Sequence, residues 1–438
     1  MRLLFRKLWV FEVVFSRNLK ELDGWTILKD DGDFLHPRAR FLIERAAADG
    51  ADFVYYDEAV FEKKPTRILR YLYKPDFAPD TLRGFNYIGK GAAFKKTLLD
   101  GDYSGYDLSF RLAERAEKIT HIRGILYYRN IANIGQDSGG DIEAIRGHLS
   151  RKGLLGEVFE VSPFHYRVKY NIESPLISII IPNRNSRGLL EQCVNSVLSK
   201  TTYTNFEIII IENNSTEEDI FGYYKYLEES YKNIRVVVYE GKYNFSAVNN
   251  FGFRHTGGEY IIMLNNDTEV ITPEWIEEML MFAGRADVGA VGAKLLYPDG
   301  GIQHAGAIVS KVYVGNYAEN NLDMYGDYMN RLAIAQNQSA VTSACLMTRR
   351  EVWEKLGGMD EVFVASFSDP DFCVRTRENG YTVIFTPFAT LYHYESKSRG
   401  YDDDDEKKAF SRKEFELFQS RHIGIIGDTD PYYCMCID

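Results

Sequence analysis

The sequence predicts an α/β fold built around a mostly parallel sheet, preceded by a smaller α/β region. Apolar runs such as Leu176–Pro182 and Tyr260–Leu264 lack the polar alternation of half-exposed strands, so they are typical of strands buried on both faces. Between them, Leu189–Leu198 repeats apolar residues at helical spacing. Strands that alternate with helices in this way indicate parallel strands joined by helical crossovers.

The remaining elements follow the same pattern along residues 175–438. A helix start is expected at Thr272-Pro273-Glu274, where a hydroxyl residue precedes proline and an acidic first turn. Further buried strands are predicted from their apolar content over Glu207–Ile211, Ile234–Tyr239, Val288–Val291, Val341–Met347 and Thr382–Phe385.

Length and composition limit the classes of protein to consider. The chain has 438 residues, of which 45% are hydrophobic and 26% charged, which suffices for two globular domains. Its net charge of -11 argues against a general nucleic-acid binder, because affinity for a polyanion depends on Lys and Arg. The five cysteines, odd in number and mostly within apolar runs, favour reduced cytosolic thiols over disulfides or a zinc site.

The first residues leave two interpretations open. No apolar run approaches the roughly 20 residues needed to span a bilayer. Arg2–Phe15 mixes basic and apolar residues, which is compatible with peripheral contact with a membrane surface. The simpler interpretation, which we favour, is a strand or helix of the domain that it opens.

The first region repeats part of the second. Leu28–Pro37 matches Leu264–Pro273 without gaps, and two further matches follow in the same order, Asp107–Arg111 with Asp371–Arg375 and Leu126–Tyr128 with Leu391–His393. The first copy has too few residues before Leu28 for the opening strand-helix-strand half. We therefore predict a partial domain over 1–152, a linker over 153–174 and a complete domain over 175–438.

Polar residues follow the predicted strands of the second domain and should meet at one edge of its sheet. Ligands of parallel α/β sheets bind beyond the carboxyl ends of the strands. Short polar side chains there can bind a base and a ribose, although ordinary turns and helix caps use the same residues. The candidates for donor binding are Pro182, Asn183, Asn185, Glu212, Asn214, Asn265 and Asn266.

Two carboxylates carry the predicted chemistry. Asp267 follows a buried strand and is the candidate ligand of a divalent cation, Mg or Mn, that neutralises a diphosphate. Asp369 is the candidate general base that deprotonates an acceptor hydroxyl. His393 and Arg399 would add metal binding or positive charge at the leaving group, while a core histidine and a surface salt bridge are the alternatives.

A set of ordered motifs resembles the bacterial family 2 glycosyltransferases that build O-antigen, rhamnan-type and other surface polysaccharides. The resemblance covers nearly all of 175–433 and rests on Asn244–Gly252, Leu264–Thr268, Gly289–Tyr297, Ile302–Gly306, Ala340–Cys345, Asp369–Cys373 and His393–Gly400.

This resemblance implies the GT-A fold, an inverting single displacement, a nucleotide-diphosphate sugar donor and a divalent cation. It implies that Asn265 and Asp267 occupy the family's Asp-x-Asp positions, with Asn replacing the first Asp. It also matches Ser368-Asp369 to the Glu/Asn-Asp pair whose acid is the base, and it adds Asn249, within the first motif, to the donor site.

The first region resembles the later half of the same fold, but it lacks the chemistry. Lys29 stands where Asn265 stands, Gly105 falls opposite Asp369, and Tyr128 replaces His393. An ammonium repels a cation and a glycine accepts no proton. We expect a non-catalytic docking or acceptor-positioning platform, or a remnant.

The acceptor side is predicted more coarsely. Asp371, His304 and Trp275 are candidates to border the acceptor, with packing as an equally good interpretation of the last two. Lys311–Gln338, rich in Tyr and Asn, is the candidate lid.

Three functions remain in view. The first is an inverting glycosyltransferase acting on a glycan or lipid-linked glycan acceptor, in the cytoplasm or at the inner face of the plasma membrane. The second is a non-catalytic scaffold of a polysaccharide assembly complex. The third, a sugar-phosphate nucleotidyltransferase, is disfavoured because no Gly-rich phosphate loop follows the first strand. The sequence indicates no oligomeric state.

Overall fold

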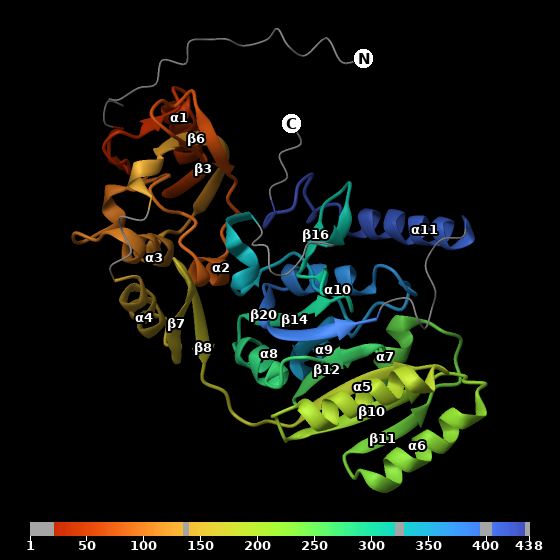
Figure 1. Ribbon diagram of the computed structural model, residues 1–438. Helices are drawn as coiled ribbons and strands as arrows, with labels where there is room; N and C mark the ends of the chain where they lie inside the picture. Colours follow the sequence, from red (N-terminus) through yellow and green to blue (C-terminus); the bar gives the residue numbers. More distant parts are fainter. Residues whose placement is uncertain (1–21, 135–139, 320–327, 395–404, 434–438) are drawn as a thin grey trace. The chain divides into compact units, whose positions relative to one another are not determined.

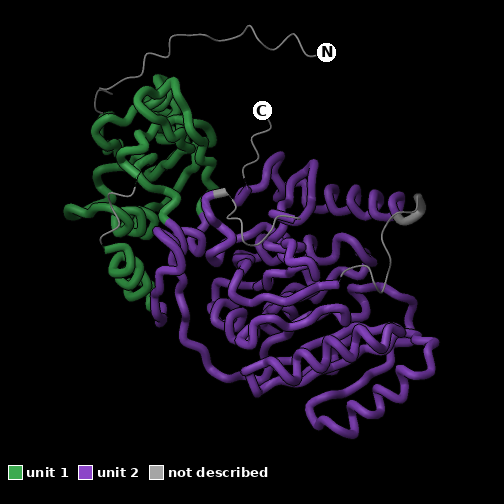
Figure 2. Tube along the Cα trace, in the orientation of Figure 1, with its two compact units in different colours: residues 1–77, 86–153 green, residues 78–85, 154–438 purple. Residues whose placement is uncertain are grey.

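The computed structural model describes residues 22–134, 140–319, 328–394 and 405–433. The chain forms two compact units, one of residues 1–77 and 86–153 and the other of residues 78–85 and 154–438 (Figure 2). Arg399, the basic start of the chain and part of the expected lid lie outside the described residues. None of the described helices is long and apolar enough to cross a membrane.

The second unit contains the large sheet, drawn from yellow-green to blue in Figure 1. Its strands are β9 (Ile177–Asn183), β10 (Phe206–Glu212), β11 (Ile234–Val238), β12 (Tyr260–Leu264), β13 (Thr268–Val270), β14 (Val288–Leu296), β15 (Ile302–His304), β18 (Gln336–Asn337), β19 (Cys345–Arg349) and β20 (Thr382–His393). Its helices are α5 (Arg187–Lys200), α6 (Glu218–Ser230), α7 (Phe245–Phe253), α8 (Trp275–Ala283), α9 (Arg350–Leu356), α10 (Ser368–Glu378) and α11 (Asp405–His422).

The order of the main strands is β11-β10-β9-β12-β19-β14-β20-β13. The α/β fold is confirmed, and the predicted parallel pairing holds from β11 to β12. Beyond β12 the sheet is mixed, because β19 is antiparallel to both of its neighbours and β13 is antiparallel to β20, whereas β14 and β20 are parallel. The expectation of a mostly parallel sheet therefore needs this correction for its second half.

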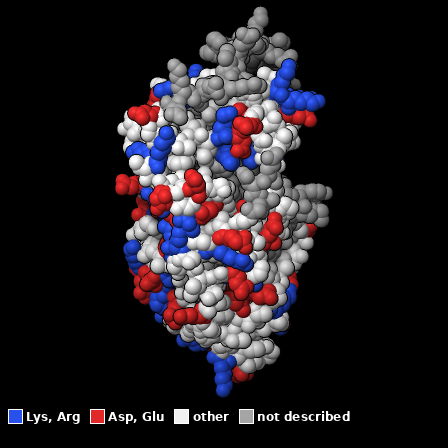
Figure 3. All heavy atoms as spheres, turned by 90° about the vertical axis from the view of Figure 1, so that its left-hand side faces the viewer, with Lys and Arg blue, Asp and Glu red and all other residues white. Residues whose placement is uncertain are grey.

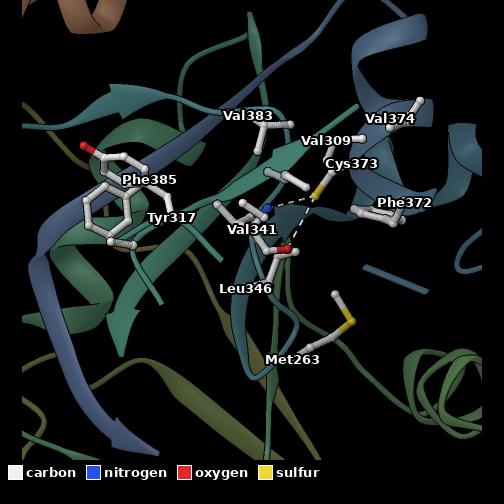
Figure 4. Packing of buried hydrophobic residues seen from close by; sticks show 14 of the residues in the cluster. Met263, Val309, Tyr317, Val341, Leu346, Phe372, Cys373, Val374, Val383 and Phe385 are labelled. Atoms are coloured by element: carbon white, nitrogen blue, oxygen red, sulfur yellow. Dashed lines mark hydrogen bonds between the residues drawn. The ribbon is translucent and has the colours of Figure 1, made fainter. Parts of the chain in front are cut away.

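Both faces of this sheet are buried, as continuous apolar strands require. On one face Ile180, Ile211 and Ile261 pack with Val248 of α7. A larger cluster joins the sheet to α9, α10 and α11, and Figure 4 shows its centre around Val341. There the thiol of Cys373 lies between the backbone N–H and C=O of Val341, at 3.5 and 3.6 Å.

Residues 153–174, expected to be a linker, contain a hairpin of β7 (Gly156–Ser162) and β8 (His165–Tyr170). The short helix α2 (Pro79–Gly84) also belongs to the second unit, although the chain on both sides of it belongs to the first. Asp80 of α2 is buried in an ion pair with Arg285. A second small hairpin, β16 (Ala307–Val309) with β17 (Val314–Asn316), and the short helix η3 (Tyr328–Ala333) complete the unit.

The first unit repeats the topology of the second half of the large sheet. Its elements are β1 (Trp25–Ile27), β2 (Phe34–Leu35), α1 (Ala39–Ala48), β3 (Phe53–Phe61), β4 (Ile68–Leu72), β5 (Ala92–Lys95), η1 (Lys96–Leu98), α3 (Gly105–Arg115), β6 (Ile119–Asn130), η2 (Ile131–Asn133) and α4 (Asp141–Arg151). The strand order β1-β5-β3-β6-β2 corresponds to β12-β19-β14-β20-β13, with the same parallel and antiparallel sense at every step. This agreement supports the predicted duplication.

Charged side chains on the face shown in Figure 3 are of both signs and interspersed. Among the described residues of this face, the figure shows no broad basic surface of the kind that binds nucleic acid.

Candidate active site

A cleft of about 620 Å³ opens at the edge of the large sheet where β9, β10, β12 and β20 end. These strands run in one direction, so the polar residues that follow them gather at this edge. The lining residues are Pro182, Asn183, Arg184, Asn185, Ser186, Asn213, Glu217, Tyr243, Phe245, Val248, Asn265, Asn266, Asp267, Thr342, Ser343, Ala344, Ala365, Asp369 and His393.

Asp267 and His393 meet at the centre of the cleft. The Nε2 atom of His393 lies 3.1 Å from Oδ1 of Asp267 and 3.3 Å from the side-chain amide of Asn265. The other ring nitrogen, Nδ1, lies 2.9 Å from Oε1 of Gln303. Thr268, next to Asp267, pairs with His393 across β13 and β20, and this register brings the carboxylate and the imidazole together.

Asp369 lies in the first turn of α10 and lines the same cleft, half-buried. Its Oδ2 accepts a hydrogen bond of 3.0 Å from the backbone N–H of Ser343, and the side chain of Thr342 also donates to it. Burial raises the pKa of Asp369 above its usual value, and these hydrogen bonds oppose the shift only in part. A carboxylate with a raised pKa is a stronger base, as a group that takes a proton from an alcohol requires.

The other end of the cleft is built from β9 and β10. Glu212 is buried and accepts hydrogen bonds from the backbone and hydroxyl of Ser215 and from the hydroxyl of Tyr224. The amide of Asn183 donates to the same Tyr224 hydroxyl at 2.7 Å and accepts from Asn266 at 2.6 Å. This network ties the ends of β9, β10 and β12 into one rigid wall.

The loop after β9 is held in a strained conformation. Asn185 has φ 53°, and its side-chain oxygen accepts from the backbone N–H groups of Thr216 and Glu217. Its backbone N–H donates to Ser215. A left-handed non-glycine residue costs free energy that these bonds offset, so the loop is fixed as part of the cleft wall.

The structure brings together eight of the residues predicted for the site. Pro182, Asn183, Asn185, Asn265, Asn266, Asp267, Asp369 and His393 all line the cleft. Glu212 lies behind the wall in the network with Tyr224, and Asn214 is exposed with its amide on the carbonyl of Gly241. Asn249 is buried within α7, where its amide donates to the carbonyl of Phe245.

The three predicted acceptor-side residues do not line the cleft. Trp275 is fully buried and donates to the hydroxyl of Thr201, so it is a core residue. Asp371 is fully buried between Arg375 and His422. His304 is also buried, but it contacts a loop of the cleft wall. Of the expected lid, the described part places Asn337 and Gln338 in the protein interior.

Sequence reasoning missed the residues that enclose the cleft from distant segments. Tyr243 and Phe245 precede and open α7, and Thr342 and Ser343 precede β19. Phe245, Thr342 and Ser343 belong to motifs of the sequence analysis, and this was the signal that could have identified them. The order of the strands was needed to place their side chains at the cleft.

The donor set at Asp267 suits a divalent cation bound together with a diphosphate. A carboxylate oxygen and an imidazole nitrogen converge, and the imidazole is oriented through its other nitrogen, as metal-binding histidines usually are. Over the described ranges, no group of three or more His, Cys, Asp or Glu residues could hold a metal ion. Two protein ligands are sufficient where substrate phosphates and water complete the coordination, as is common for Mg²⁺.

Part of the second unit is similar to a known protein family. Residues 178–357 match the sequence profile of glycosyl transferase family 2. The matched range holds both the wall of the cleft and Asp267, whereas Asp369 and His393 follow it.

Two relatives align along almost the whole chain. An uncharacterized protein, y4gI, of Sinorhizobium fredii is 36% identical in an alignment of 434 positions that covers 91% of this chain and 47% of that protein. The O-antigen biosynthesis protein RfbC of Myxococcus xanthus is 32% identical in an alignment of 423 positions that covers 91% of this chain and 32% of that protein. The chain therefore spans less than half the length of both relatives.

Solved structures are similar at a lower level. One is a mannosyltransferase of Pyrobaculum calidifontis in complex with GDP-Man and Mn²⁺, with a TM-score of 0.43, 18% identity and coverage of 57% of this chain and 65% of that one. Another is GalNAc-T7 with UDP, GalNAc and Mn²⁺, with a TM-score of 0.46, 14% identity and coverage of 62% and 59%.

Proposed function

We propose that the chain is an inverting glycosyltransferase that moves a sugar from a nucleotide-diphosphate donor to a hydroxyl of a growing bacterial surface glycan. The observation that carries this proposal is that Asp267 and Asp369 line one cleft of a unit in which residues 178–357 match the glycosyl transferase family 2 profile. We assign Asp267 to the leaving group and Asp369 to the incoming alcohol. The name of the Myxococcus relative supports an O-antigen-type product.

The roles of the residues follow from their positions. Asp369 takes the proton of the acceptor hydroxyl while the hydroxyl oxygen bonds to the anomeric carbon of the sugar. The bond between that carbon and the diphosphate oxygen breaks on the opposite side, so the configuration inverts. Asp267 and His393 would hold a Mg or Mn ion, which when bound neutralises the charge of the leaving diphosphate.

Selective binding of the donor is assigned to the rigid wall. Asn183, Asn185 and Asn266 present amide groups at the cleft, and Arg184 adds a cation there. Because hydrogen bonds within the protein fix Asn183 and Asn185, their remaining polar atoms are oriented before the donor binds.

The first unit is proposed to be a non-catalytic platform that positions the acceptor. It repeats the half of the fold that contains β12 to β20, but Lys29 and Gly105 replace the ligand and the base in the predicted alignment. A lipid-linked acceptor at the cytoplasmic membrane face is the partner proposed for the whole protein.

A donor-hydrolysis screen tests the proposed function. The protein is incubated with Mn²⁺ and each of the common nucleotide sugars, and release of the nucleoside diphosphate is measured. We expect slow release from one donor, and addition of EDTA should stop it. If no donor is hydrolysed and calorimetry detects no nucleotide or nucleotide-sugar binding with Mn²⁺, the proposal is wrong and a scaffold role is favoured.

A further inference from the structure

We propose that two adjacent residues, Gln303 and His304, position the two halves of the active site separately, Gln303 the metal half and His304 the base half. This inference rests on the proposed function and assigns roles within the same site. Neither residue lines the cleft, and both are at least 96% buried, with relative exposures of 4% and 1%. Each acts through another residue.

Gln303 controls the imidazole of His393. Its Oε1 lies 2.9 Å from Nδ1 of His393, and a carbonyl oxygen can only accept. Nδ1 therefore carries the hydrogen, and in the neutral ring Nε2 keeps its lone pair. Nε2 faces Asp267 at 3.1 Å, so Gln303 presents the histidine as a ligand. Such partners of metal-binding histidines fix both the tautomer and the ring orientation.

His304 controls the loop that holds Asp369. Its Nε2 accepts a hydrogen bond of 3.1 Å from the backbone N–H of Thr342, and its Nδ1 lies 2.8 Å from Oδ1 of Asn316. The next backbone N–H, that of Ser343, donates to Asp369. Burial lowers the pKa of His304 to about 4, so its Nε2 is free to accept at neutral pH.

A β-bulge explains how neighbouring residues serve the same site. Side chains at adjacent strand positions normally point to opposite faces. In the pairing of β15 with β14, His304 is opposite Leu295 and Ile302 is opposite Leu296, so the register shifts by one residue at Gln303. An extra residue of this kind re-aims the side chains beside it.

The residues that follow lock the bulge in place. Ala305 is fully buried, and Gly306 adopts φ +99°, which side chains rarely tolerate. A Cβ atom at Gly306 would lie 2.4 Å from the side chain of Gln338. Within Ile302–Gly306, Gln303 and His304 thus contact residues of the cleft, and Gly306 fits against Gln338.

The two halves remain connected through the backbone, where β12 pairs with β19. The N–H of Asn265 donates to the carbonyl of Ala344 at 3.0 Å, which joins the loop held by His304 to the segment before Asp267. The effect of a substitution on the metal half or on the base half can therefore be recognised only if Mn²⁺ affinity and nucleotide release are measured separately.

The test uses the full chain with Gln303→Met, His304→Leu and His304→Gln, and Gln336→Met as a control. Gln336 is a fully buried glutamine of the same unit whose side chain bonds with Arg331 and Gln338, so its loss reports the general cost of removing a buried amide. Mn²⁺ affinity is measured with the metal alone, by the electron paramagnetic resonance of free Mn²⁺. Nucleotide release is then measured at increasing Mn²⁺ concentrations.

We expect Gln303→Met to weaken Mn²⁺ binding about 10- to 100-fold, as for other partners of ligating histidines. Its nucleotide release should recover at high Mn²⁺. His304→Leu should bind Mn²⁺ within about twofold of the wild type but release nucleotide at least about tenfold more slowly at every Mn²⁺ concentration. His304→Gln keeps an acceptor near Thr342 and should recover much of that rate.

Equal Mn²⁺ affinity in Gln303→Met and the wild type would overturn the first half of the inference, and so would an equal loss in Gln336→Met. Recovery of His304→Leu by excess Mn²⁺, or its failure to recover in His304→Gln, would overturn the second half. If Gln303→Met does not fold, Gln303→Asn takes its place. This variant withdraws the acceptor by one methylene, and we expect the same loss of Mn²⁺ affinity. A wild type that binds Mn²⁺ but hydrolyses no donor contradicts the proposed function, and the Mn²⁺ affinities of the variants still decide the division of roles.

Discussion

His393 lies with its Nε2 atom 3.1 Å from Oδ1 of Asp267, at the point where β20 and β13 pair beside the cleft. The two residues are 126 positions apart in the chain, yet the antiparallel register fixes their contact. A carboxylate and an imidazole at this distance suit either an ion pair or joint coordination of a metal ion. The orientation of the imidazole by Gln303 favours coordination.

His393→Ala should weaken Mn²⁺ binding by at least about tenfold, because it removes one of the two proposed protein ligands. The thermal unfolding temperature without metal should change little, since His393 lines the cleft and is not part of the large apolar cluster. Calorimetric titration with Mn²⁺ in the presence of UDP or GDP checks the first point. Unchanged Mn²⁺ affinity would remove His393 from the metal site.

The rate of transfer should fall in acid at a higher pH than an ordinary aspartate would give. Asp369 must be ionised to accept a proton, and burial raises its pKa above 3.8. The rate should therefore rise with pH through the raised pKa and then level off. A profile of kcat/KM against pH at saturating Mn²⁺ measures this, and an acid limb at or below the ordinary aspartate pKa would contradict the role of Asp369.

Asp369→Asn should leave the protein as stable as the wild type, or more stable, at pH 7. A carboxyl whose pKa is raised by folding contributes stability below its unfolded pKa of 3.8, and this contribution is lost as pH rises through the folded value. At neutral pH the ionised group lowers the free energy of unfolding, and an amide removes that cost. Urea unfolding of both proteins at pH 7 and pH 4 measures the difference in stability. A clear loss of stability in the variant at pH 7 would contradict the prediction.

Trp275→Ala should destabilise the protein by about 3–5 kcal/mol, the usual cost of emptying a buried aromatic site. Trp275 is fully buried and its indole donates to Thr201 at 2.9 Å. The KM for the donor should stay near that of the wild type at a temperature where the variant is folded. A large change in KM without loss of stability would restore Trp275 to the substrate site.

Asp80→Ala should cost about 3–5 kcal/mol of stability, because it removes the buried carboxylate that pairs with the buried Arg285. The carboxylate of Asp80 is bound by Arg83 at 2.8 Å and by Arg285. These partners hold the pKa of Asp80 well below its usual range, against the effect of burial, so the loss should appear throughout the neutral range. Chemical unfolding measures it, with Asp287→Ala, which removes an exposed partner of the same arginine, as the milder control.

The sequence was sufficient to predict several buried strands of the second unit and the polar residues that follow them into the cleft. β12 coincides with the predicted Tyr260–Leu264, and Asp267 follows it into the cleft, because a buried strand and the polar turn after it are both local signals. Neither the antiparallel β19 nor the bulge at Gln303 has a local signal, since both depend on partners far along the chain. Trp275 lies in the core, which was one of the two interpretations that the sequence left open for it.

The assignment of α2 to the second unit shows most clearly what could not be predicted from the sequence. Asp80 lies within the region predicted as one partial domain, but it pairs with Arg285, 205 positions away. A short helix between two strands gives no indication of the unit against which it packs. Only the buried charge hints at a partner, because an unpaired buried carboxylate is too costly to retain.

The most direct test of the account compares Asp267→Ala and Asp369→Asn in one assay with the donor that the wild type hydrolyses. Donor binding with Mn²⁺ is measured by calorimetry, and nucleotide release is measured on the same samples. We predict that Asp369→Asn binds the donor like the wild type but releases no nucleotide, whereas Asp267→Ala loses Mn²⁺-dependent binding. Release at the wild-type rate by either variant would contradict the claim that the two carboxylates act on one sugar.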